Sequence, residues 1–185
     1  ARPQLTFQYN TEVTRLEGSL ALAGLHYLSN SSLDRINQFY RLNGWQQLTP
    51  RLGFSLGAYL TSDSTLQEEL LTSGVFITRT LRTSYGATPG FSFRLSERWS
   101  TYLSYGFNYT DYQTRQYFYN YRTHSLSQGF DYLWTEKTIL RSFLTASYNK
   151  YNAGNTAANL GFQLGFNHKF TENFDLTLMG GANIR

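Results

Sequence analysis

Residues 98–110 read RWSTYLSYGFNYT and alternate between two kinds of side chain. The odd positions from Trp99 to Tyr109 are large and apolar or aromatic, apart from one threonine, whereas the even positions from Ser100 to Thr110 are mostly small and polar. Successive side chains of a β-strand point to opposite faces of the sheet. The stretch therefore predicts a strand with one apolar face and one polar face.

Residues 158–169 repeat this alternation, with Leu160, Phe162 and Leu164 opposed to Gly161 and Gln163. Small polar side chains cannot build a hydrophobic core, so the apolar face must be buried against something else. Apolar-out, polar-in strands are typical of membrane barrels, where lipid covers the outward face. We therefore predict an all-β fold, an antiparallel up-and-down transmembrane β-barrel, as a single domain over residues 1–185.

Four short segments divide the chain, and each places a large apolar residue before a polar turn. They are residues 48–51, 95–98, 134–137 and 170–173. We expect them to be hairpin turns on one rim, the periplasmic one, because outer-membrane barrels keep short turns inside and long loops outside. About ten strands of membrane-spanning length follow. The predicted strands are 3–9, 14–28, 35–47, 51–61, 83–95, 98–111, 117–133, 137–149, 156–169 and 173–184.

Two parts of the chain fit this frame less simply. Residues 62–82 break the alternation and are expected to form a long extracellular loop. Pro89 lies inside a predicted strand, although proline has no N–H for the ladder. We expect a bulge there, or a position where the ladder hydrogen bond is already lost.

The composition excludes several other classes of protein. Bulk hydropathy is low, with a mean of −0.43 and 41% hydrophobic residues, and no stretch reaches the roughly 20 apolar residues of a membrane helix. Neither observation argues against a membrane barrel, because polar lumen-facing residues alternate with apolar lipid-facing ones along each strand and lower the mean hydropathy. The absence of cysteine excludes disulfides, thiolate catalysis and cysteine metal sites. The net charge of +4 comes from scattered basic residues, so no nucleic-acid partner is expected.

The two ends of the chain raise the question of completeness. No signal-peptide pattern opens the sequence, which predicts a processed or trimmed N-terminus. Periplasmic turns would leave both terminal strands ending on the extracellular side, and the chain ends on Arg185 rather than on an aromatic residue. We expect one strand to be missing from each end of a parent with about twelve strands, and a closed ten-stranded barrel is the alternative.

The stretch 61–112 resembles a known family. Residues 68–74 (EELLTSG), 82–89 (RTSYGATP), 93–98 (FRLSER) and 105–112 (YGFNYTDY) are similar to members of the family known as β-barrel porin type 2. The resemblance covers nearly the whole chain. It implies a bacterial outer-membrane protein, in some members associated with exopolysaccharide systems. The shared motifs are structural, so the resemblance implies no catalytic residues.

Aromatic residues are unusually frequent, at 17% of the chain. Tyrosine and tryptophan gather at membrane interfaces, where one end of the side chain is apolar and the other is wet. We predict a periplasmic girdle of Trp99, Trp134, Phe170 and Phe174 and an outer girdle that includes Tyr105, Tyr109 and Tyr112. Tyr117, Tyr119 and Tyr121 flank the predicted loop 111–117 and are candidate loop contacts. The alternative to a girdle is a carbohydrate-binding platform.

Five charged residues fall on the lumen-facing parity of their strands. They are Arg94, Asp131, Arg141, Lys169 and Asp175. One interpretation is structural, with ion pairs that plug a narrow interior, and the other is a lining that sets ion selectivity. Three basic residues against two acidic ones predict a mild preference for anions. A barrel of ten or twelve strands is partly filled by side chains, so a wide aqueous channel is not expected.

The sequence carries no motif for catalysis, metal binding or a cofactor, and no enzyme activity is expected. His26, His124 and His168 fall on the apolar parity, where they are poorly placed to act on an aqueous substrate. The first functional hypothesis is a porin-like or narrow channel for small solutes or saccharides. The second is a non-conducting structural barrel whose loops dock partner proteins or surface polysaccharide. A soluble barrel with a ligand inside is disfavoured by the glycine and serine on the polar face.

Overall fold

The structure is a computed structural model that describes residues 3–26, 28, 34–64, 80–113 and 118–185. The described residues form ten β-strands and no helix. The strands are β1 (Gln4–Asn10), β2 (Thr14–Leu25), β3 (Arg35–Thr49), β4 (Leu52–Ser64), β5 (Leu81–Arg94), β6 (Trp99–Tyr112), β7 (Tyr121–Thr135), β8 (Thr138–Tyr151), β9 (Thr156–Lys169) and β10 (Asp175–Ile184).

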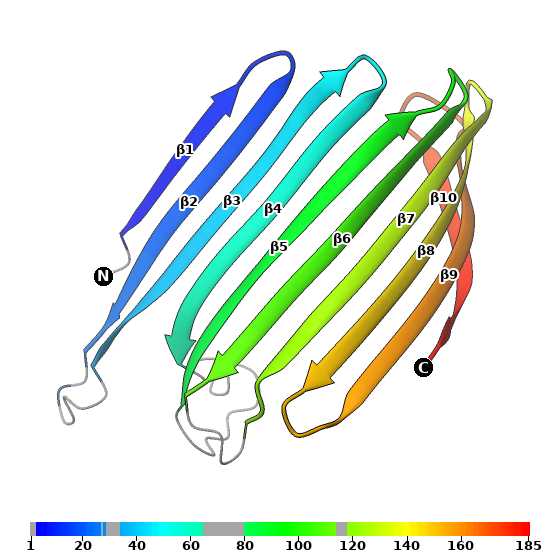
Figure 1. The fold of residues 1–185 in the computed structure, drawn as a ribbon. Helices are drawn as coiled ribbons and strands as arrows, with labels where there is room; N and C mark the ends of the chain where they lie inside the picture. Colours follow the sequence, from blue (N-terminus) through cyan, green and yellow to red (C-terminus); the bar gives the residue numbers. More distant parts are fainter. Residues whose placement is uncertain (1–2, 27, 29–33, 65–79, 114–117) are drawn as a thin grey trace.

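All ten strands form one antiparallel sheet in chain order, so every strand pairs with its sequence neighbours. Figure 1 shows the sheet bending backwards on its C-terminal side, so that β10 lies behind β8 and β9. The β1–β2 and β3–β4 turns lie along the upper rim, which we call the short-turn rim, and the β8–β9 turn lies along the lower rim, which we call the long-connection rim (Figure 1). β1 and β10 form the two edges of the sheet and are not paired with each other. The up-and-down antiparallel order is the one predicted.

The strands match the predicted ranges closely, and the largest differences lie beside the long connections. The predicted loop 62–82 is shorter than expected at both ends, because β4 continues to Ser64 and β5 begins at Leu81. An ion pair joins these extensions: Arg82 donates to Asp63 through Nε at 3.0 Å and Nη2 at 2.7 Å. Residues 65–79 of that predicted loop lie outside the described residues.

Pro89 interrupts the β5–β6 ladder without shifting it. Ala87 pairs with Phe107 and Gly90 pairs with Ser104 in one continuous register, while Thr88 and Pro89 have no partner on β6. On its other side Pro89 still pairs with Leu56 of β4. The predicted lost ladder position is therefore present, and the predicted bulge is not, because an inserted residue would have shifted the register.

The short turns share a local cause. Ser96 Oγ accepts hydrogen bonds from the backbone N–H groups of Arg98 and Trp99, at 3.3 and 3.1 Å. Thr49 Oγ1 accepts equivalent bonds from residues 51 and 52, and Thr135 Oγ1 accepts one from residue 137. A hydroxyl that satisfies backbone donors two or three residues later favours a turn over a continued strand. A fourth turn of this kind, in which Thr11 Oγ1 accepts from the N–H of Thr14, joins β1 to β2.

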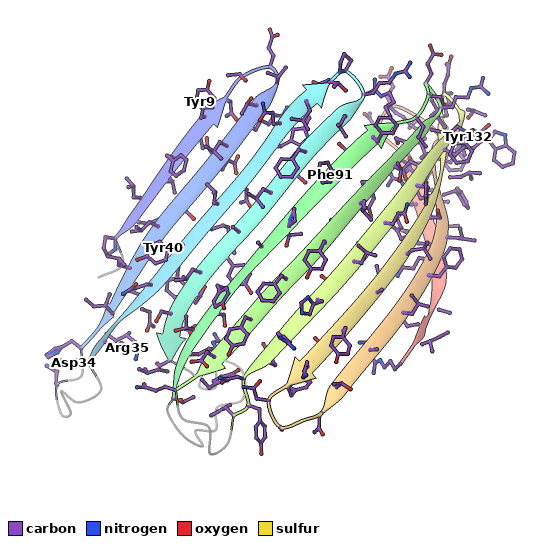
Figure 2. The ribbon with its side chains drawn as sticks, viewed as in Figure 1. Tyr9, Asp34, Arg35, Tyr40, Phe91 and Tyr132 are labelled. Carbon is purple, nitrogen blue, oxygen red and sulfur yellow. The ribbon has the colours of Figure 1, made fainter. Side chains whose placement is uncertain are left out.

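The sheet has no second layer, so its hydrophobic side chains lie on a surface. Ala21 is the only buried hydrophobic residue among those described. Cross-strand partners point to the same face, so the register divides the strands into an apolar face and a polar face. Figure 2 labels four residues that the register places on the apolar face: Tyr9, Tyr40, Phe91 and Tyr132. This face is the one that lipid would cover in a membrane barrel.

Candidate functional site

The five charged residues predicted to line a lumen all lie on the polar face. Arg94, Asp131 and Arg141 belong to one row across the sheet, because Arg94 pairs with Ser100, Ser100 with Asp131, and Asp131 with Arg141. Lys169 and Asp175 are directly opposite each other on β9 and β10. The register thus brings them together in two groups. Their role as a channel lining stays a prediction.

The polar face also carries charges that the sequence reasoning did not select. In the described strands this face holds seven basic residues and four acidic ones. They are Arg15, Arg35, Arg41, Arg82, Arg94, Arg141 and Lys169, with Glu17, Asp63, Asp131 and Asp175. Strand parity was a sufficient signal for the additional residues, but Phe39 and Trp45 on the polar face of β3 obscured the alternation there.

Two ion pairs neutralise part of this charge. Arg82 holds Asp63 with two hydrogen bonds, and both side chains are mostly buried. Arg141 Nε lies 3.4 Å from Asp131 Oδ1, with both side chains about one-third exposed. Among the described residues, Arg41 and Arg94 have no carboxylate within 4 Å. The polar face therefore keeps unneutralised positive charge after its ion pairs are formed.

A hollow of about 410 Å³ lies on the polar face beside the short-turn rim. Trp45 and Tyr102 provide aromatic surface there, and Arg94 and Asp131 provide charge. The Arg15 guanidinium lies 5.8 Å from the ring centre of Trp45, so a further cation adjoins the hollow. Guanidinium groups bind carboxylates and phosphates through paired N–H donors, and aromatic faces accept flat rings. This arrangement suits a small solute that combines a ring with a negative charge.

Aromatic residues of the predicted periplasmic girdle lie at the short-turn rim. Trp99 packs against Tyr132 with ring centres 4.4 Å apart, and Phe170 packs against Phe174 at 5.5 Å. Trp134 is 60% exposed, the most exposed aromatic residue of the group. All of them are accessible to a surrounding medium, as a girdle requires.

The predicted outer-girdle residues occupy three different environments. Tyr105 lies near the middle of β6, where its hydroxyl is 2.6 Å from His124 Nδ1. Tyr109 packs against Tyr85 at 5.5 Å on the apolar face, close to the long-connection rim. Tyr112 ends the strand and stacks on Phe118 at 5.0 Å. The structure does not bring them together into one belt, and their membrane role stays a prediction.

The candidate loop contacts are only partly described. Tyr117 lies outside the described residues, as do residues 114–116 of the predicted loop 111–117. Tyr119 is 54% exposed. Tyr121 packs against Tyr151 with ring centres 5.7 Å apart, at the rim formed by the start of β7 and the end of β8.

Among the residues that the structure describes, each histidine has one hydrogen-bond partner of its own. His26 Nδ1 lies 2.7 Å from Asp34 Oδ2, His124 is bonded to Tyr105, and His168 Nδ1 lies 2.8 Å from Thr138 Oγ1. Within the described ranges, no three His, Asp or Glu side chains are grouped so that they could hold a metal ion. The same ranges contain no helix that is long and apolar enough to span a membrane.

Comparison with known proteins identifies the fold. No model of a known protein family matches the chain, and no curated protein resembles it significantly in sequence. Among solved structures, OmpT, an outer membrane protein of Vibrio cholerae, superposes with a TM-score of 0.73 at 13% identity, over 97% of this chain and 53% of OmpT. The outer membrane channel DcaP of Acinetobacter baumannii gives 0.67 at 8% identity, over 99% and 51%.

The Pseudomonas putida toluene transporter TodX is a more distant match, with a TM-score of 0.52 at 12% identity, over 99% of this chain and 68% of TodX. The chain thus spans about half the length of the first two barrels. The predicted fold class is confirmed: the chain has the all-β, up-and-down fold of outer-membrane β-barrels. The location expected from the sequence, a bacterial outer membrane, agrees with this fold.

Proposed function

We propose that this chain forms the wall of a narrow, porin-like channel in a bacterial outer membrane, which passes small solutes or saccharides with a mild preference for anions. The observation that carries the proposal is the polar face, where small side chains are combined with seven basic and four acidic residues. Charge of one sign along a pore attracts ions of the other sign. Arg41 and Arg94 are the strongest candidates for this role, because neither has a carboxylate partner among the described residues.

The solved structures with this fold support a channel. DcaP is an outer membrane channel and TodX is a toluene transporter. At 8% and 12% identity these similarities support the fold, but they do not identify the solute that this chain would pass. Membership of the β-barrel porin type 2 family, on the motifs at 93–98 and 105–112, is part of the same proposal.

The hollow beside Arg94 is the proposed first contact for a solute near the short-turn rim. Its aromatic walls, Trp45 and Tyr102, offer flat apolar surface, while Arg94 offers charged donors. A sugar presents an apolar ring face together with hydroxyl groups, and an acidic sugar adds a carboxylate. Each of these features has a complementary group in the hollow.

The proposal includes no enzyme activity, cofactor or nucleic-acid partner. Each of the three histidines bonds to a single neighbour, and these pairs lie on different parts of the sheet. Phosphate-binding glycine loops are absent from the sequence, and basic residues do not form a cluster within it. The chemistry on the polar face is that of binding and passage.

A second candidate function is a structural barrel that anchors a surface assembly or a polymer-export partner through its loops. The ion pairs Asp63–Arg82 and Asp131–Arg141 favour it, because paired charges fill an interior without attracting solutes. The polar face also carries bulky residues: Tyr102 packs against Phe143 with ring centres 5.9 Å apart. Partner proteins or surface polysaccharide would then contact the segments 62–82 and 111–117.

Electrical recording separates the two functions. We expect the full-length protein to give stepwise currents in planar lipid bilayers, and a salt gradient to give a reversal potential on the anion-selective side. Replacing Arg41 and Arg94 together (Arg41→Gln with Arg94→Gln) is expected to move the reversal potential towards cation selectivity. Lys137→Gln is the matched control, because Lys137 lies in a short turn rather than in a strand of the polar face.

Each outcome bears on one function. Absence of stepwise current, from protein that is shown to be folded, supports the structural barrel and contradicts the channel. A current whose selectivity is the same in the arginine variant and the parent leaves the channel standing but contradicts the role of Arg41 and Arg94.

A further inference from the structure

Across the ten strands together, the apolar face carries two basic residues. The other lysines and arginines of the strands lie on the polar face. Arg122 of β7 and Lys150 of β8 instead lie on the apolar face, the same face as Phe130 of β7 and Leu144 of β8. A basic residue on the lipid-facing side of a membrane barrel is tolerated best at the level of the lipid headgroups, where an anionic headgroup can meet it. Both side chains are exposed.

Arg122 and Lys150 are direct cross-strand partners. Like charges placed directly opposite each other on a sheet repel, and an anion bound between them reverses that effect. Within the described residues no carboxylate lies within 4 Å of either one. The nearest acidic position on the same face is Asp111, whose carboxylate already accepts a hydrogen bond from Asn120.

The pair lies where the headgroups of the outer leaflet would be. Trp134, at the short-turn rim, is on the same strand as Arg122. Trp134 is twelve positions beyond Arg122, which corresponds to about 40 Å along the strand at roughly 3.3 Å per residue. With a strand tilt of about 40°, this corresponds to about 30 Å along the membrane normal, slightly more than the roughly 25 Å apolar band of a membrane barrel.

An apolar groove begins directly below the pair. It has a volume of about 590 Å³ and is lined by Tyr105, His124, Leu126, Ala146, Tyr148 and Leu160, among others. His124 and Tyr148 are the next residues after Arg122 and Lys150 on the same face, so the groove continues from the two charges towards the middle of the sheet. The small side chain of Ala146 leaves room for a hydrocarbon chain between its larger neighbours.

We propose that Arg122 and Lys150 bind the phosphate of a phosphorylated outer-leaflet lipid, and that one of its acyl chains occupies the groove below. Arg122 supplies paired guanidinium donors and Lys150 a second positive charge, a combination that suits a phosphate. The groove supplies apolar contact for the chain attached to that phosphate. This lipid site lies on the opposite face from the proposed solute path, so either can exist without the other.

Thermal unfolding in detergent tests the site. Full-length protein is mixed with lipid A, with dephosphorylated lipid A that keeps the same acyl chains, or with inorganic phosphate. We expect a rise in Tm with lipid A alone. The rise is expected to disappear in the double variant Arg122→Gln with Lys150→Gln. It is expected to persist in the control Arg98→Gln with Lys137→Gln, which removes two charges from turns at the other rim.

A charge-preserving exchange covers the case in which the glutamine variant folds poorly. Arg122→Lys with Lys150→Arg keeps both cations and is expected to retain the lipid-dependent rise. An equal rise with dephosphorylated lipid A, or retention of the rise in the glutamine variant, overturns the phosphate contact. An equal rise with inorganic phosphate overturns the lipid as its source.

A separate substitution tests whether an acyl chain occupies the groove. Ala146→Leu fills the space and is expected to reduce the lipid-dependent rise while leaving both charges in place. Ala58→Leu is the control, because Ala58 lines a separate apolar groove formed by β1–β4, where the apolar face has no basic residue. Equal effects of the two substitutions contradict the assignment of the acyl chain to the Ala146 groove.

Discussion

At the scale of single residues, aromatic rings of the polar face lie across glycines. Tyr59 extends from β4 over Gly86 of β5, and its hydroxyl donates to Asn108 Oδ1 of β6 at 3.0 Å. Tyr102 of β6 lies in the same way over Gly129 of β7. A glycine at each of these positions leaves room for the ring, which therefore rests along the wall.

Gly86→Ala is expected to displace the Tyr59 ring. An added Cβ would lie 2.8 Å from Tyr59 Cε1 and 2.7 Å from the backbone oxygen of Phe107, which is closer than packed atoms allow. Overpacking of this kind costs about 1–3 kcal/mol. The measurement is the free energy of unfolding in urea, followed by gel mobility of unboiled samples. Gly57→Ala is the control, since its nearest neighbour would be 3.6 Å away, and similar losses in both variants would contradict the close-packing argument.

At the scale of elements, the turns are determined locally and the strand ends are not. The short turns could be predicted because the hydroxyl residue and the backbone N–H groups that it accepts from lie within four consecutive positions, as at Ser96. The extensions of β4 and β5 could not, because the Asp63–Arg82 pair joins residues 19 positions apart. Phe143 also obscured the alternation in β8, because it puts a large apolar residue on the polar face. It lies there in contact with Tyr102 of β6, two strands away, and sequence alternation cannot reveal such a contact.

The same contrast applies to the candidate site. Parity within a strand was enough to place Arg94, Asp131, Arg141, Lys169 and Asp175 on one face. The hollow was beyond sequence reasoning, because Trp45, Arg94 and Asp131 come from β3, β5 and β7 and meet only through the register of the intervening strands.

Ser96→Ala tests the turn mechanism. The substitution removes the acceptor for two backbone N–H groups, those of Arg98 and Trp99. Because the turn is solvent-accessible, water replaces part of the loss, and we expect a destabilisation of about 0.5–1.5 kcal/mol. Ser100→Ala, an exposed serine on the polar face of the adjoining strand, should change the urea midpoint by much less. The turn mechanism fails if the two substitutions have the same effect.

At the scale of the whole molecule, the single-layer sheet requires a surrounding that replaces a core. Leu160, Leu164 and Ile184 are 55%, 54% and 69% exposed on the apolar face. Contiguous apolar surface of this extent is not tolerated by a soluble monomer. A membrane barrel tolerates it because hydrocarbon covers the face.

We therefore expect the full-length protein to require detergent for extraction and to migrate differently on gels before and after boiling. The closed, hydrogen-bonded barrel resists unfolding by detergent until it is heated, which is the reason for the shift. A protein that stays soluble without detergent would contradict the membrane assignment, and the apolar face would then have to line an internal ligand cavity.

The gap beside Pro89 has a mechanical consequence. Thr88 and Pro89 leave two positions of β6, Tyr105 and Gly106, without ladder partners on β5, although the strands continue in register on both sides. A sheet opens most easily where the fewest bonds must break together. Amide hydrogen exchange in detergent is therefore expected to be faster at Tyr105, whose N–H points towards β5 beside the gap, than at Thr101 or Tyr109, whose N–H groups point the same way farther from it. Under heat or mechanical load, we expect separation of the sheet to begin along this seam between β5 and β6.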